Sequence, residues 1–525
     1  MGDQNEQTNA LDPVADLAAR TERIRRDMGG AAKVARLHER GDRTIRDHIA
    51  GLVDPGSFTE LGTFSRSLRH EDRDSTPGDG KIGGHGTIDG RPVAVFGDDV
   101  TVRRGSSSVV GSRKIMRLEE RAVEAGMPIV HFGQTGGGRI PDLIGSEGIS
   151  DAGESFGVSA TRRRRVPMAT AIVGQSFGGS SFQSALSDFV VMVEGACLAV
   201  TSPRVFEIAT GEVVTFDEVG GVDVHARHTG QIDLGVADHD EAYEAIRRWL
   251  GYLPPNAWTP APRAEPAGSL DPDPELAAIV PTRRTRGYDM RRLVDRLCDP
   301  GTMFELQPLF ARQATVALGR IDGWSVGVVA NNPMFQAGVL DPEACRKIIR
   351  IVCLCDAFNL PVIFLVDVPG FMVGKRVEHG RILHVGMRMM QALQNAVTPT
   401  LTVCVRKAFG LAWQAMNGAN MVNHGLYSWP GAEIGFMDPD VGVNVAFAAR
   451  LAAIDDPDER EAERRRLVAE VGEATSPYEA AGTMRIDEII DPATTRAVLA
   501  AELGRLANRR VPPPEARPLS YWPTC

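Results

Sequence analysis

VGQSFGGSSFQSAL, residues 173–186, is the stretch from which the fold follows. An apolar run ends at two adjacent glycines, Gly178 and Gly179, and an amphipathic segment starts directly after them. Adjacent glycines cost backbone entropy, so they are typical of places where the chain takes unusual dihedral angles or is approached closely. The stretch predicts a strand, a glycine turn and a helix whose first N–H groups are free. The helix is predicted from apolar residues at the spacing of one helical face, namely Phe182, Ala185, Leu186, Phe189, Val190 and Val193.

The pattern around this stretch occurs twice in the chain. Four segments of the first half return in the second half, in the same order and at an almost constant spacing. The pairs are GTIDGRPVAV (86–95) with GRIDGWSVGV (319–328), RKIMR (113–117) with RKIIR (346–350), GMPIV (126–130) with NLPVI (359–363), and VPMATAIVGQSFG (166–178) with TPTLTVCVRKAFG (398–410). An ordered series of matches at nearly one offset predicts that a single domain has been duplicated.

Each copy has the pattern of an α/β domain. In the second copy, Asp341 and Pro342 are typical of a helix start, and apolar residues continue one helical face to residue 358. A buried strand, PVIFLVDV, follows. The first copy predicts a matching helix over 112–125. Proline-rich sequence separates the copies, so the predicted domains are 1–255 and 286–525 with a linker at 256–285.

Composition excludes several classes of protein. The chain has 525 residues and a formal net charge of −10, so it has no overall basic field to hold nucleic acid or an anionic membrane. Its seven cysteines show no metal-binding or disulfide spacing. No stretch has the length and hydrophobicity of a membrane-spanning helix or the pattern of a secretory signal. We therefore expect a cytoplasmic protein without a metal site.

Each copy contains two glycine loops. QTGGGRI (134–140) and Gly178-Gly179 end neighbouring predicted strands in the first copy, and DVPGF (367–371) and AFGLA (408–412) do so in the second. Two such turns can direct two backbone N–H groups at one oxygen atom, which is the geometry of an oxyanion hole. The alternative is that the glycines only close tight turns. A P-loop and a serine hydrolase are excluded, because the motifs that define them are missing.

These motifs carry a resemblance to a known family. TPGDG (76–80), GGGRI, GQSFGG, EVGGVDVH (218–225), CDAFNLPVIFLVDVPGF (355–371) and RKAFG resemble the carboxyltransferase subunit of biotin-dependent acyl-CoA carboxylases, of the propionyl-CoA carboxylase β type. The resemblance covers the chain from about residue 15 to 515. It implies two tandem crotonase-like α/β domains, with an acyl-CoA on the N-terminal domain and carboxybiotin on the C-terminal domain. The implied reaction moves a carboxyl group from carboxybiotin to the α-carbon of an acyl-CoA through an enolate.

The resemblance also assigns roles to individual residues. The thioester oxygen of the acyl-CoA would bind at Gly137, Gly138, Gly178 and Gly179. The ureido oxygen of biotin would bind at Gly370, Phe371, Gly410, Leu411 and Ala412. The sequence departs from the family at Gln134, Thr135 and Gly138 in the first loop and over Leu383–Met387. In addition, Leu411 replaces a glycine, and Gln414 replaces an aspartate that shapes the acyl pocket. We therefore expect Gln414 to affect the choice of acyl-CoA.

Partners follow from the same resemblance. Biotin would be carried on a separate biotin carboxylase or carboxyl carrier subunit, and this chain would form a homohexamer, a trimer of dimers. Coenzyme A phosphates need only local cations; Arg162–Arg165 is one such cluster, although a solvated loop is the favoured interpretation. Two alternatives stay open, a biotin-dependent acyl-CoA decarboxylase subunit and a catalytically weakened scaffold subunit of a mixed carboxylase.

Overall fold

The computed structural model describes residues 12–522, and the chain divides into two compact units. The first unit runs to Arg162 and includes Met168–Val224 and Gly235–Arg247. The second contains Arg163–Pro167, His225–Leu234 and the chain from Arg248 onwards. Each unit is built on one eight-stranded sheet.

The two sheets have the same strand order. The first is β1-β2-β3-β4-β5-β6-β8, with β7 also paired to β5, and the second is β9-β10-β11-β12-β13-β14-β16, with β15 also paired to β13. The first-sheet strands are β1 (Thr59–Glu60), β2 (Lys81–Ile88), β3 (Arg91–Asp98), β4 (Ile129–Thr135), β5 (Met168–Phe177), β6 (Phe189–Val193), β7 (Cys197–Ala199) and β8 (Leu234–Val236). The second-sheet strands are β9 (Phe304–Leu306), β10 (Ala314–Ile321), β11 (Trp324–Asn331), β12 (Val362–Val368), β13 (Thr400–Phe409), β14 (Gly425–Ser428), β15 (Glu433–Gly435) and β16 (Glu488–Ile489).

The register of the strands repeats as well. Ala94 pairs with Ile129 where β3 meets β4, and Gly327 pairs with Val362 where β11 meets β12. The sequence repeat aligns Gly327 with Ala94 and Val362 with Ile129, so the same two positions pair in both sheets. The irregularity between Gly133 and Thr135 recurs between Val366 and Val368. The predicted duplication therefore extends to individual backbone pairings.

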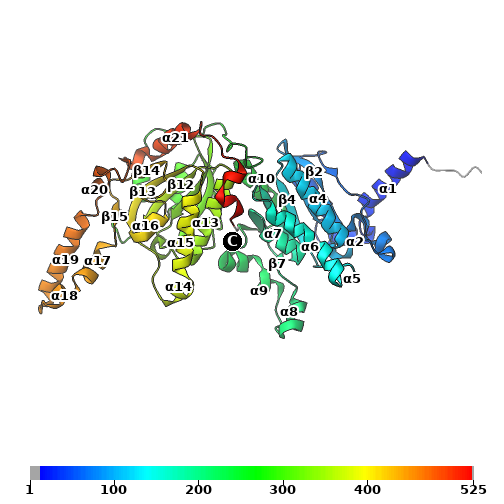
Figure 1. The fold of residues 1–525 in the computed structure, drawn as a ribbon, viewed down its shortest axis with the longest axis horizontal. Coiled ribbons are helices and arrows are strands. Elements are labelled where there is room, and N and C mark those ends of the chain that lie inside the picture. The colour runs from blue at the N-terminus through cyan, green and yellow to red at the C-terminus, as the bar shows by residue number, and fades with distance from the viewer. Residues whose placement is uncertain (1–11, 523–525) are drawn as a thin grey trace, which may run out of the picture. The chain divides into compact units, whose positions relative to one another are not determined.

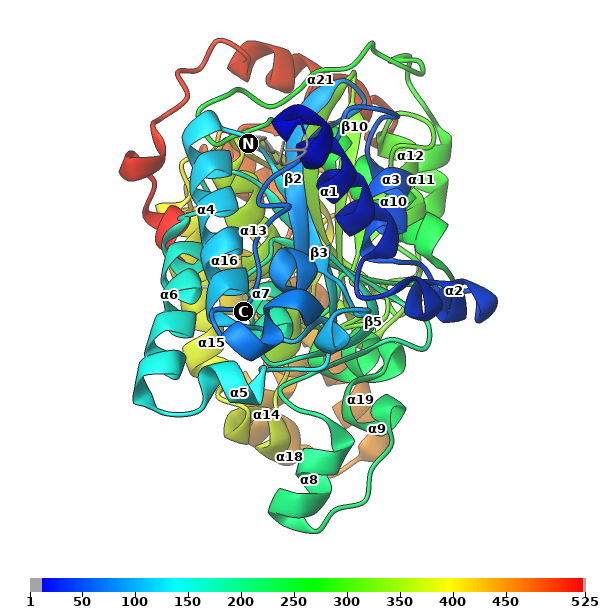
Figure 2. The same ribbon diagram turned by 90° about the vertical axis from the view of Figure 1, so that its right-hand side faces the viewer.

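Helices cover the sheets in matching positions. The α-helices of the first half are α1 (Pro13–Asp27), α2 (Ala31–Glu39), α3 (Ile45–Leu52), α4 (Val109–Ala125), α5 (Ile140–Leu143), α6 (Ser146–Thr161), α7 (Gly179–Ala185), α8 (Pro203–Thr210), α9 (Phe216–Gly220) and α10 (His239–Tyr252). Figure 2 shows α4 and α6 side by side, and α4 also packs against β2 and β3. In the second unit α13 packs against α15, β10 and β11 in the same way (Figure 1).

The second unit has more helices than the repeat requires. Its α-helices are α11 (Glu275–Ile279), α12 (Arg291–Leu297), α13 (Pro342–Ala357), α14 (Lys375–His379), α15 (Ile382–Asn395), α16 (Gly410–Ala415), α17 (Pro439–Ala446), α18 (Ala448–Ala452), α19 (Pro457–Glu473), α20 (Pro477–Gly482) and α21 (Thr495–Leu506). Helices α17, α18 and α19 pack on one another around a small core of Val443, Leu451 and Leu467. Among the described residues no helix is long and apolar enough to cross a membrane.

The expected helix boundaries were confirmed at three places. Asp341 caps α13, because its carboxylate accepts a hydrogen bond from the Ala344 amide at 2.8 Å. Helix α4 ends at Gly126, which has a φ of 68°. Helix α7 starts directly after Gly178, which has a φ of 59° and a ψ of −124°. Glycine is the residue that adopts this last conformation without steric cost.

The predicted length of the helix after Gly179 was wrong. Helix α7 ends at Ala185, and Phe189–Val193 is the buried strand β6. Asp188 ties the chain after the helix to the first residue of β5. Its amide donates to the Met168 carbonyl at 2.8 Å, and its carboxylate accepts from the Met168 amide at 3.0 Å. A short buried strand and a buried helix have the same apolar composition, so periodicity alone does not separate them.

Candidate active site

The two glycine turns of the first unit lie against each other. Gly137 and Gly138 follow β4, and Gly178 follows β5, its parallel neighbour. Gly137 has a φ of 104° and Gly178 a φ of 59°, so both are in the region that favours glycine. A Cβ atom placed on Gly178 would lie 3.5 Å from the Gly137 Cα and 3.7 Å from the Gly138 nitrogen. The structure therefore brings together the loops that the sequence predicted as partners.

Two amides in these turns have no acceptor among the described residues. The Ser107 amide donates to the Gly137 carbonyl at 2.9 Å and the Arg139 amide to the Ser107 carbonyl at 2.7 Å, which leaves the Gly138 amide between them unbound. Gly179 is the first residue of α7, where N–H groups have no partner within the helix. Two free donors on touching turns can bind one oxygen atom that carries negative charge.

The second unit repeats this backbone arrangement. An isolated β-bridge pairs Leu340 with Phe371, as one pairs Ser107 with Gly138 in the first unit. The sequence repeat aligns Leu340 with Ser107 and Phe371 with Gly138. Gly370 has a φ of 148° and Gly410 a φ of 63°. The amides equivalent to those of Gly138 and Gly179 belong to Phe371 and Leu411, and neither has an acceptor among the described residues. Ala412 follows Leu411 in α16 and is buried.

A buried ion pair between Arg139 and Asp79 fixes the first turn. The Arg139 guanidinium donates to the Asp79 carboxylate at 2.5 Å, and the two residues are 5% and 0% exposed. Asp79 also accepts from the Gly111 amide at 2.9 Å, at the start of α4. The position equivalent to Arg139 in the second unit is Met372, whose amide makes the same backbone bond, to Leu340, at 2.8 Å. The second turn has a different buried ion pair, in which the Arg406 guanidinium donates at 2.9 Å to the carboxylate of Asp367, three residues before Gly370.

A basic pocket lies beside the first turn. It has a volume of about 670 Å³, and its lining includes Gln134, Thr135 and Gly136, directly before the turn. Four cationic side chains line it, namely Lys33, Arg36, Arg40 and Arg104, together with two carboxylates, Asp42 and Glu194. Lys33 donates to the Thr101 carbonyl at 2.9 Å, whereas the three guanidinium groups have no hydrogen-bond or ion-pair partner among the described residues. Such a set of cations is suited to phosphate groups.

A mostly apolar pocket lies beside the second turn. It has a volume of about 480 Å³, and its lining includes Gly410, Leu411, Trp413, Phe436 and Ile486. Gln414 also lines this pocket, and its Oε1 is buried without a hydrogen-bond partner among the described residues. A buried amide oxygen without a donor is costly, so this atom is suited to a ligand that carries an N–H group.

Comparison with known proteins gives the family. The family model of the carboxyl transferase domain matches residues 36–518. This chain belongs to the carboxyl transferase family. The carboxyltransferase subunit of propionyl-CoA carboxylase from Haloferax mediterranei is 37% identical over 497 residues, which are 93% of this chain and 95% of that protein. The expectation of a carboxyltransferase enzyme is confirmed.

Two further relatives illustrate the range of reactions in the family. The methylmalonyl-CoA carboxyltransferase 12S subunit of Propionibacterium freudenreichii subsp. shermanii is 37% identical and covers 92% of each chain. The methylmalonyl-CoA decarboxylase subunit alpha of Veillonella parvula is 34% identical and covers 92% of this chain and 93% of its own. A solved structure of transcarboxylase 12S, described as a hexamer with methylmalonyl-coenzyme A bound, matches with a TM-score of 0.88 over 95% of this chain and 96% of its own at 36% identity. This match confirms the two tandem crotonase-like α/β domains.

The titratable groups behind the first turn of this carboxyltransferase are not suited to acid–base catalysis at neutral pH. His131 in β4 is buried, and burial lowers its pKa to about 3, so the imidazole is neutral. Its ring nitrogens lie 3.4 Å from the Thr170 and Ser180 hydroxyls. Burial raises the pKa of the Asp98 carboxyl, which pairs with Lys81. These groups form a buried polar network beneath the turn.

One expectation about the cations of this carboxyltransferase was wrong. Arg162 and Arg164 are buried and not part of a solvated loop; the Arg162 guanidinium donates to the Asp188 carboxylate at 2.9 Å. The basic pocket beside the first turn instead contains cations that the sequence analysis did not single out. The signal that could have found them was the spacing of Lys33, Arg36 and Arg40, which places two cations on adjoining positions of α2 and the third at its C-cap.

Proposed function

We propose that this carboxyltransferase moves a carboxyl group between carboxybiotin and the α-carbon of an acyl-CoA. The observation that carries the proposal is the duplicated pair of unbound amides, one pair in each unit, each beside a pocket of different chemistry. One pocket is basic and the other mostly apolar, as two different ligands require. The boundaries 1–255, 256–285 and 286–525 divide the chain into the acyl-CoA domain, a linker and the biotin domain.

The first unit would bind the acyl-CoA. The α-proton of the thioester would pass to the biotin group once its carboxyl group has left, and the Gly138 and Gly179 amides would stabilise the negative charge that then develops on the thioester oxygen. The Gly137 and Gly178 conformations hold these amides in place. The guanidinium groups of Arg36 and Arg40 would bind the coenzyme A phosphates in the basic pocket. Transcarboxylase 12S, a relative of similar fold, has methylmalonyl-coenzyme A bound.

The second unit would bind the biotin group. When bound, carboxybiotin supplies the carboxyl group that is transferred. The Phe371 and Leu411 amides, held by Gly370 and Gly410 and followed by Ala412, would bind the ureido oxygen. The unpaired Gln414 Oε1 would accept a hydrogen bond from a ligand N–H. The apolar lining suits a fused ring with few polar atoms.

Partners are needed to complete this reaction. Biotin would be attached to a separate carrier subunit and carboxylated by a biotin carboxylase, in the cytoplasm. A homohexamer is proposed because the solved structure of transcarboxylase 12S, a relative of similar fold, is a hexamer assembly.

The direction of transfer is a separate question. The decarboxylase relative from Veillonella parvula favours testing the reverse reaction as well. In that direction the same amides would stabilise the same enolate, because a catalyst lowers the barrier of both directions.

The partial reaction with free biotin tests the proposal without a partner subunit. Purified protein is incubated with free biotin and either malonyl-CoA or methylmalonyl-CoA, and the decarboxylated acyl-CoA is measured. The expected result is biotin-dependent loss of the carboxyl group. No reaction with free biotin, and none with a carboxylated carrier subunit that binds the protein, would contradict the proposal and favour a scaffold subunit.

A further inference from the structure

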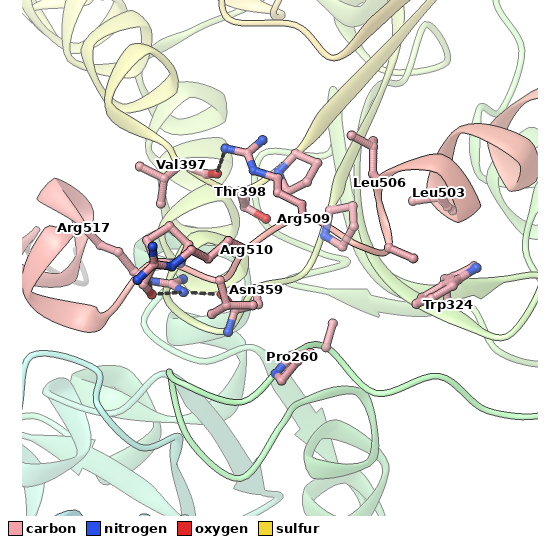
Figure 3. A pocket seen from close by; sticks show the side chains of 16 residues that line it. Pro260, Trp324, Asn359, Val397, Thr398, Leu503, Leu506, Arg509, Arg510 and Arg517 are labelled. Carbon is pink, nitrogen blue, oxygen red and sulfur yellow. Dashed lines mark hydrogen bonds between the residues drawn. The ribbon is translucent and has the colours of Figure 1, made fainter.

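The second unit contains another cavity, at the opposite end of its sheet from the glycine turn. Pro361 and Pro399, directly before β12 and β13, line it, whereas the turn follows the last residues of those strands. The cavity has a volume of about 100 Å³ (Figure 3). Its other walls come from the end of α21 and the segment that follows α21. It therefore shares no residue with either pocket of the proposed carboxyl transfer.

The charge of this cavity is unusual for a protein with a net charge of −10. Three arginines, Arg509, Arg510 and Arg517, line it, and no aspartate or glutamate does. None of the three forms an ion pair with a carboxylate among the described residues. Arg517 is 1% exposed and donates to backbone carbonyls and the Asn359 side chain. Arg510 has no hydrogen-bond partner among the described residues, so its guanidinium is available to an anion.

The cations and the apolar residues occupy different sides of the cavity. Figure 3 shows Arg510 and Arg517 on the side of Val397, and Leu503, Leu506 and Trp324 on the other. Arg509 is held in place, since it donates to the Val397 carbonyl at 2.7 Å. A cavity with this division suits a ligand with one anionic end and one apolar end.

We propose that this cavity binds a small amphipathic carboxylate. Its carboxylate lies against Arg510, and its aliphatic chain lies against Leu503 and Leu506. The space is smaller than the roughly 150 Å³ cavity that holds benzene, so about four chain carbons fill it, while the carboxylate and the carbon next to it lie at the exposed Arg510. An inorganic anion would leave the leucine side empty, and an uncharged alcohol or amide would leave Arg510 unpaired.

Calorimetric titration of the purified protein with acetate, butyrate, hexanoate and hexanamide tests this proposal. We expect affinity to rise about four-fold for each buried methylene from acetate to butyrate, as apolar area leaves water. Hexanamide, which keeps the chain without the charge, is expected to bind at least ten-fold more weakly than hexanoate. Equal affinity for acetate and hexanoate, or for hexanoate and hexanamide, would overturn the proposal.

Two variants place the binding in this cavity. Arg510→Gln removes an exposed cation without a partner, so the variant is expected to fold and to bind hexanoate at least five-fold more weakly, with hexanamide unchanged. Arg376→Gln, at an exposed residue of α14, is the matched control and is expected to bind like the wild type. Hexanoate binding that Arg510→Gln leaves unchanged, or that excess acyl-CoA abolishes, would assign the ligand to another site and overturn the proposal. A crystal soaked with 6-bromohexanoate gives an independent readout, with bromine expected beside Leu503 and Leu506.

Discussion

Arg139 distinguishes the first glycine turn from the second. Both turns have the same backbone bridge, yet only the first is also held by a buried guanidinium on Asp79. A thioester that develops charge during the reaction needs donors that are fixed beforehand. We therefore assign Arg139 a positioning role for the Gly138 amide.

Replacing Arg139 by methionine, the residue at the equivalent position 372, tests this role. The single variant leaves the Asp79 carboxylate buried and unpaired, which we expect to cost about 3–5 kcal/mol of stability. Arg139 also pairs with the Asp142 carboxylate at 3.0 Å, so the triple variant Asp79→Asn, Asp142→Asn and Arg139→Met is expected to recover most of this stability while kcat stays at least ten-fold low and KM changes little. Chemical denaturation and steady-state kinetics measure the two effects. If kcat returns together with stability, the ion pair only supports the fold.

Gln414 is expected to affect the choice of acyl-CoA. Gln414 lines the pocket proposed for biotin, which the α-carbon of the acyl group must approach to receive the carboxyl group, and an aspartate there would add charge to a mostly apolar surface. We predict that Gln414→Asp changes the relative kcat/KM for competing acetyl-, propionyl- and butyryl-CoA while activity survives. Gln391→Glu, which adds a carboxylate at an exposed residue of α15, is the control. Unchanged ratios in Gln414→Asp would show that this position does not select the substrate.

At the scale of elements, α2 and its C-cap residue supply Lys33, Arg36 and Arg40, three of the four cations of the basic pocket. If these cations bind coenzyme A phosphates, the double variant Arg36→Ala, Arg40→Ala should raise the KM for acyl-CoA on the order of ten-fold or more, with kcat nearly unchanged. The reason is that each lost charge weakens binding equally in the ground state and in the transition state. The corresponding acyl-pantetheine lacks the nucleotide phosphates, so its KM should not change.

Arg20→Ala in α1, where Arg20 pairs with Asp16 on an exposed surface, is the matched control. An equal rise in KM for acyl-CoA and acyl-pantetheine would contradict a phosphate role for α2.

Strand β4 makes the first unit sensitive to acid. Buried His131 has a pKa of about 3 in the folded protein, whereas its ordinary pKa is 6.5. Between these two pH values the unfolded chain binds more protons than the folded protein, so the free energy of unfolding falls as the pH falls. From pH 7 to pH 5 this residue alone costs about 2 kcal/mol. The equivalent residue of β12 is Phe364, which does not titrate. We predict that His131→Phe removes this loss and leaves the stability of the first unit less dependent on pH over this range.

Urea unfolding at the two pH values measures this difference, with His379→Gln at an exposed position of α14 as the control. Equal losses in His131→Phe and the wild type would contradict the argument.

The sequence predicted most elements, and its errors have physical causes. The repeat located both glycine turns because backbone conformation restricts the residue type. The strand β6 was missed because a buried apolar run shows no period of two, and the carboxylate of Asp188, which ends the helix, acts through distant partners. The proposed role of Arg36 and Arg40 was missed because the sequence does not show whether a cation on a short helix faces a pocket or the solvent.

On the scale of the whole molecule, duplication explains how one chain can bind two different ligands. One domain with a pair of glycine turns, copied in tandem, gives two proposed sites that are then free to diverge. His131 and Ser180 lie behind the turn of the first copy, and the second copy has the apolar residues Phe364 and Ala412 at the equivalent positions. Both copies keep the amides, which are the part that the proposed chemistry needs.

The most direct measurement is the rate of carboxyl transfer in the variant Gly179→Pro. Proline is tolerated at the first position of a helix but has no N–H group, so this variant deletes one donor and keeps α7. Gly179→Ala, which keeps the N–H, is the control. We predict that kcat for biotin-dependent transfer falls roughly 100-fold in Gly179→Pro and less than ten-fold in Gly179→Ala, with acyl-CoA still bound. A folded Gly179→Pro protein with the wild-type rate would contradict an oxyanion hole at this turn.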